Sequence, residues 1–137
     1  MTAYGAVQKI GVGVVNRFTA STDLMTEVGS RVYNDLAPAD SALPLIVWKF
    51  VDVTQSRIFD ADIRYEVAIE FAIYGRKQDA LALHTIATLL ETAFDSTIAA
   101  EDFDRVTLMR QNPSMPLYLD DSWSMIIKYN AVGYKTS

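Results

Sequence analysis

The feature that most constrains the fold is a stretch of twelve residues in which large apolar side chains alternate with polar or small ones. The apolar positions begin at Ile63, and Arg64, Glu66 and Glu70 are among the residues between them. A period of two over this length is typical of a β-strand with one buried face. Such a face is buried only against another element, so the sequence predicts a sheet built around residues 63–74.

Three more strands are predicted beside this central one. Pro44 precedes a β-rich run at 45–51, and polar residues 54–62 connect that run to the central strand. This arrangement predicts a hairpin whose extended loop projects into solvent. Two further strands are predicted at 105–111 and 122–134, after the central one. They are joined by a second long loop at 112–121.

Three helices complete the predicted order. Residues 78–94 carry apolar side chains at spacings of three and four, which indicates an amphipathic helix packed on the sheet. Residues 3–18 carry a similar stripe, interrupted by glycines that often mark close approach to another backbone. A short helix is predicted to run to about Ser30, after the N-cap candidates Ser21, Thr22 and Asp23.

The predicted order is therefore α-α-β-β-α-β-β, and the fold class is α+β. We expect an antiparallel sheet of about four strands with helices packed on one face. The chain of 137 residues shows no repeat or linker, so residues 1–137 are predicted to form one domain.

Composition excludes several classes of function. The chain has no cysteine and one histidine, which removes thiol chemistry and leaves little for metal binding. Acidic residues outnumber basic ones by 17 to 12, a balance that disfavours tight binding to DNA or to an anionic membrane. No apolar run approaches the length of about 20 residues that spans a bilayer, and no secretory signal is recognised. We expect a structural subunit without a cofactor, made in the cytoplasm.

Three motifs that resemble chemical sites have simpler explanations. Gly11 and Gly13 lack the preceding strand and the third glycine of a dinucleotide-binding fingerprint. The acid pairs at 60/62 and 102/104 lack the glycine and distal glutamate of a calcium-binding EF-hand loop. His84 lies on the polar side of its helix with no assigned catalytic partner. We predict no catalytic, cofactor or metal site. A small α+β enzyme that uses His84 or a buried carboxylate in a pocket between sheet and helices stays an alternative.

Both long loops carry large apolar residues that solvent-exposed loops seldom contain. Such side chains either fold back to complete the core or contact another subunit, because aromatic residues, methionine and arginine are enriched at interfaces. The candidate contact residues are Arg57, Ile58 and Phe59 in the first loop and Met115, Leu117 and Tyr118 in the second.

Element order and three short strings give the chain a resemblance to a known family. The strings are Arg31-Val32-Tyr33, then Leu43-Pro44-Leu45-Ile46-Val47-Trp48, and a closing Trp123-Ser124-Met125-Ile126-Ile127-Lys128-Tyr129. The sequence resembles the small tail-completion and tail-terminator proteins of long-tailed bacteriophages. The resemblance implies a virion subunit without catalytic residues.

The resemblance also implies a homo-oligomeric ring of about six copies at the head-proximal end of a tail. Its partners would be the tail tube and the neck or connector proteins. DNA would pass through the ring without specific binding, helped by an acidic lumen. The candidates for lumen acids are Glu101, Asp102, Asp120 and Asp121. Another neck or head-closure component is the alternative.

Overall fold

The computed structural model describes residues 1–58, 62–111, 115–119 and 122–136. These described residues form three helices and seven strands. They are α1 (Ala3–Ala20), α2 (Thr22–Glu27), β1 (Val32–Asn34), β2 (Leu45–Ile58), β3 (Asp62–Gly75), α3 (Ala80–Ala93), β4 (Ser96–Ile98), β5 (Val106–Arg110), β6 (Leu117–Leu119) and β7 (Ser122–Thr136).

The seven strands form one mixed sheet in the order β1-β2-β3-β7-β5-β4, with β6 paired to the end of β7. Among the strand pairs of the described residues, only β1–β2 is parallel. The prediction of an α+β fold is confirmed, whereas the predicted size of about four strands, the all-antiparallel pairing and the order α-α-β-β-α-β-β are wrong. Strands β1, β4 and β6 have three residues each, too few to show a period of two.

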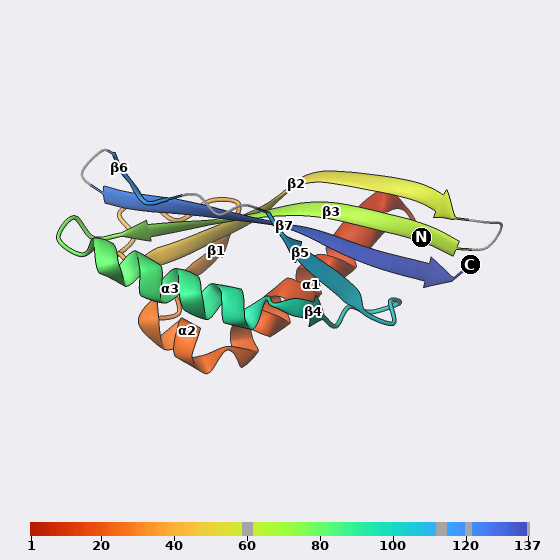
Figure 1. Cartoon of the computed structure of the whole chain (residues 1–137), viewed down its shortest axis with the longest axis horizontal. Helices are drawn as coiled ribbons and strands as arrows, with labels where there is room; N and C mark the ends of the chain where they lie inside the picture. The colour runs from red at the N-terminus through yellow and green to blue at the C-terminus, as the bar shows by residue number, and fades with distance from the viewer. Residues whose placement is uncertain (59–61, 112–114, 120–121, 137) are drawn as a thin grey trace.

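The helices pack on one face of this sheet and bury a continuous core (Figure 1). Alternation along β3 is as predicted: Tyr65, Ile69 and Ile73 are fully buried on that face. Phe71 of β3 stacks against Phe94, at the end of α3, with ring centroids 4.8 Å apart. The central strand therefore supplies the surface on which the helices rest.

Two residues of α1 fix this helix against the segment that runs from the end of α3 through β4. A Cβ added at Gly13 would lie 2.4 Å from the carbonyl oxygen of Ala99, which confirms the predicted close approach to another backbone. The Arg17 guanidinium donates hydrogen bonds of 2.7 Å to the carbonyl oxygens of Ala93 and Thr97. The Ala93 carbonyl is among the last of α3, which have no partner within the helix.

The first predicted loop, 54–62, is largely strand. β2 pairs with β3 from Leu45↔Tyr74 to Ile58↔Asp62, with one irregularity between Phe50 and Asp52. The polar run at 54–57 lies outside the core, where a strand does not need apolar side chains. The second predicted loop, 112–121, contains β6, which forms a hairpin with β7.

Candidate assembly surfaces

The longest open edge among the described residues belongs to β2. On one side, β1 pairs only with Ile46–Trp48, whereas β3 pairs along nearly the whole other side. Residues 49–58 therefore present backbone groups that no described strand covers. Figure 1 shows this part of the β2–β3 hairpin at one end of the sheet, beyond α3. An open edge of this kind accepts a strand or loop from another chain.

The first group of candidate contact residues lies at the end of this hairpin. Arg57 is exposed on β2, opposite Ile63 of β3. Ile58 is the last residue of β2, while Phe59 lies outside the described residues. The candidates thus lie at the end of the β2–β3 hairpin, where β3 also pairs with β7 out to Asp62↔Thr136. We call residues 49–58 and 62–69 the hairpin arm.

The second group lies on and before β6. Met115 is 76% exposed, Leu117 58% and Tyr118 40%, so these side chains do not complete the core. The Tyr118 ring packs against Trp123 of β7, with centroids 5.2 Å apart. Their contact with another subunit stays a prediction.

Two of the four proposed lumen acids are held in ion pairs. The Lys9 ammonium lies 2.5 Å from Asp102 and 3.5 Å from Glu101, and Lys135 lies 4.0 Å from Asp102. The hydrogen bond from Lys9 holds the pKa of Asp102 below its ordinary value. Asp120 and Asp121 lie outside the described residues.

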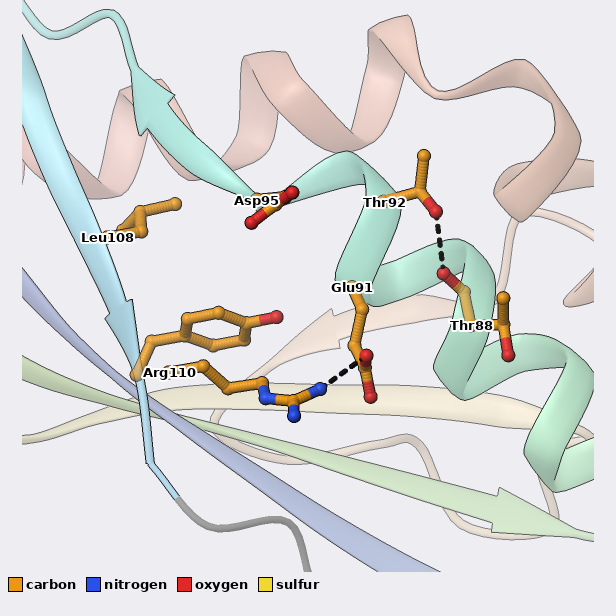
Figure 2. A pocket seen from close by; sticks show the side chains of 7 residues that line it. Thr88, Glu91, Thr92, Asp95, Leu108 and Arg110 are labelled. Atoms are coloured by element: carbon orange, nitrogen blue, oxygen red, sulfur yellow. Dashed lines mark hydrogen bonds and ion pairs between the residues drawn. The ribbon is translucent and has the colours of Figure 1, made fainter.

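A pocket of about 410 Å³ lies between α3 and the strands β5 and β7 (Figure 2). Its helix side is a stripe with spacings of three and four, and its strand side includes Arg110 of β5 and Tyr129 of β7. The Arg110 guanidinium forms an ion pair with Glu91. The stripe consists of Thr88, Glu91 and Thr92 on α3 and of Asp95 just after its C-cap.

Tyr129 is 2% exposed yet lines this pocket. Burial raises the pKa of its phenol to about 12; the carboxylates of Glu91 and Asp95 add to the rise and Arg110 opposes it. The phenol therefore stays neutral at physiological pH, so its oxygen keeps a proton to donate and lone pairs to accept.

Sequence reasoning missed this pocket. The sequence of this helix shows a polar side that includes Thr88, Glu91 and Asp95, but such a side by itself indicates only a solvated face. This polar side becomes part of a pocket because β5 and β7 pair in a register that places Arg110 opposite Tyr129. The residue pattern of one strand does not determine that register.

The features proposed for an enzyme do not come together in the described structure. His84 is exposed on α3 and is not among the residues that line the pocket. Among the described residues, no three histidine or acidic side chains gather closely enough to hold a metal ion. No helix in this part of the chain is long and apolar enough to cross a membrane.

The fold has a counterpart among solved structures. It matches a chain in the solved structure of the virion of a native gene transfer agent particle, at 13% identity and a TM-score of 0.82. The match covers 96% of this chain and 98% of the other, and it shows a shared fold. Comparison with curated proteins gave no match.

The family follows from the sequence itself. The model described as "Tail completion protein gp17" matches residues 12–131, and the chain belongs to this family. It is therefore a structural tail component of a phage-like virion and not an enzyme. The predicted resemblance and the predicted location in the virion are confirmed.

Proposed function

We propose that this protein terminates the tail tube by forming a ring of about six copies at the head-proximal end of the tail. The ring stops further addition of tube subunits and provides the surface on which the neck docks. Family membership supports a role in tail completion.

The observation that carries the ring is the open edge of β2 on the hairpin arm. Copies in a ring contact one another through two unlike patches, because each copy meets one neighbour on either side. The arm, with its exposed Arg57 and uncovered backbone groups, is one such patch. The body of the sheet and its helices offer the other.

The exposed β6 residues are proposed to contact a different partner. Met115, Leu117 and Tyr118 form a small apolar group on a hairpin at the opposite end of β7 from the arm (Figure 1). A patch that is separate from the arm suits the tail tube or the neck protein.

DNA is proposed to pass through the ring without specific contact. The net charge of −5 disfavours phosphate binding. Since Lys9 neutralises Glu101 and Asp102 in part, these two acids would repel DNA less than free carboxylates. Asp120 and Asp121 stay candidates for the lumen.

Electron microscopy of particles made with and without the subunit tests this function. We expect particles that lack it to carry tails of irregular length without attached heads. Tails of normal length whose heads alone fail to attach would favour the alternative, a neck or head-closure component.

A further inference from the structure

The pocket between α3 and β5 is rich in hydrogen-bond acceptors. The hydroxyls of Thr88 and Thr92 donate to the carbonyl oxygens of His84 and Thr88, each over 2.9 Å. Their protons are thereby used within the helix, and only oxygen lone pairs face outward. The carboxylates of Glu91 and Asp95 add acceptors alone. The ligand that suits such a lining carries several N–H donors and a positive charge.

One guanidinium already lies in the pocket, yet it leaves acceptors unmatched. Arg110 pairs with Glu91, while Asp95 forms no ion pair with any described residue. The buried Tyr129 hydroxyl also forms no hydrogen bond within the described part of the chain. No fully buried side-chain oxygen or nitrogen of the described residues lacks a partner. The Tyr129 oxygen therefore reaches the open space of the pocket.

The position of these acids is unfavourable for the helix itself. Glu91 lies in the last turn of α3, where the helix dipole disfavours negative charge and no basic residue is present, and Asp95 follows just after the C-cap Phe94. Arg110 offsets this cost for Glu91. Asp95 has no ion-pair partner among the described residues, and a cation brought from outside would supply one.

Arg57 is the cation that best fits this requirement. Most other basic residues in the described part of the chain already have a partner. All of the other arginines except Arg105 pair with an acid or donate to a carbonyl oxygen, and so do two of the lysines. Lys49 and Lys128 lie directly opposite Glu70 across the sheet. Arg57 is exposed near the end of the arm, whereas Arg105 lies beside β5 on the body of the molecule. The engaged residues are Lys9, Arg17, Arg31, Arg64, Arg76, Arg110 and Lys135.

We propose that the pocket between α3 and β5 receives the Arg57 guanidinium of a neighbouring copy, which pairs with Asp95 and donates to the exposed oxygens around it. The inference rests on the proposed ring and names its contact: the arm of one copy against the helix–sheet pocket of the next. This contact joins unlike surfaces and so repeats around a closed ring.

Disulfide crosslinking tests this contact cleanly, because the chain has no cysteine of its own. Gln55→Cys lies on the same face of β2 as Arg57, and Thr92→Cys lies in the pocket; both variants keep Arg57 and Asp95. Particles that contain the two variants in equal amounts should yield a crosslinked dimer after oxidation. The matched control is Leu81→Cys, exposed on the same helix away from the pocket, which should give no dimer with Gln55→Cys.

Charge exchange provides a second test. Arg57→Glu and Asp95→Arg should each lower the amount of subunit in purified particles by about tenfold, and the double variant should restore most of it. Absence of both the crosslink and the rescue, in particles that carry a ring, overturns this contact and leaves the proposed function intact. If imaging shows no ring of this subunit on the tail, the proposed function fails and this inference fails with it.

Discussion

At the scale of single residues, folding stability depends most on positions where two backbone segments come into direct contact. Gly13 faces the Ala99 carbonyl so closely that no side chain fits between them, whereas Gly11 faces the more yielding ring of Phe50 at 3.3 Å. Both lie on α1, so any gain in helix propensity from alanine is the same for each, about 1 kcal/mol.

We predict that Gly13→Ala lowers the free energy of unfolding by about 1–3 kcal/mol, because α1 must shift away from Ala99. Gly11→Ala is the matched control and should change stability by less than about 1 kcal/mol. Urea unfolding followed by circular dichroism measures both. Equal stability of the two variants would show that the contact at Gly13 relaxes without cost.

Tyr129 gives a pH dependence that can be measured. Its pKa is about 12 in the folded chain and about 10 when unfolded. Because the folded state favours the neutral phenol, its contribution to stability is fully present below pH 10 and is lost as pH rises from about 10 to 12. Tyr129→Phe should remove this part of the decline. An identical decline in the variant, measured by denaturant unfolding at several pH values, would assign it to other groups.

At the scale of elements, the sequence predicted those strands and helices that are long enough to show a periodic apolar pattern. The alternation of β3 and the apolar stripe of α3 correspond to a real strand and a real helix, since each buries one face. β1, β4 and β6 were missed because three residues carry no period. The polar end of β2 was predicted as a loop because its side chains are largely solvent-exposed, although its backbone is fully paired with β3.

The β6 hairpin carries the prediction that belongs to this scale. Leu117→Asp should leave the free energy of unfolding within about 0.5 kcal/mol of the parent, because Leu117 is 58% exposed. It should nevertheless reduce incorporation into particles, because it places a charge in the proposed contact with the tube or neck. Leu81→Asp, at a 77% exposed position on α3, is the control and should be incorporated normally. Unfolding of the Leu117 variant would place that side chain in the core after all.

At the scale of the whole molecule, the feature most relevant to assembly is that the candidate contact surfaces lie apart from one another. The sheet extends the arm at one end and the β6 hairpin at the other (Figure 1). The acceptor-rich pocket lies between α3 and the strands β5 and β7. Sequence alone pointed to Arg57 and Tyr118 by residue type, but it placed both in loops. The pocket stayed hidden because α3, β5 and β7 meet only through long-range register.

Cryo-electron microscopy of purified particles would locate the subunit directly. We predict one closed ring of about six copies at the head-proximal end of the tail, with each arm reaching the α3–β5 pocket of the next copy. A subunit found in single copies, along the tube, or only within the head would contradict it.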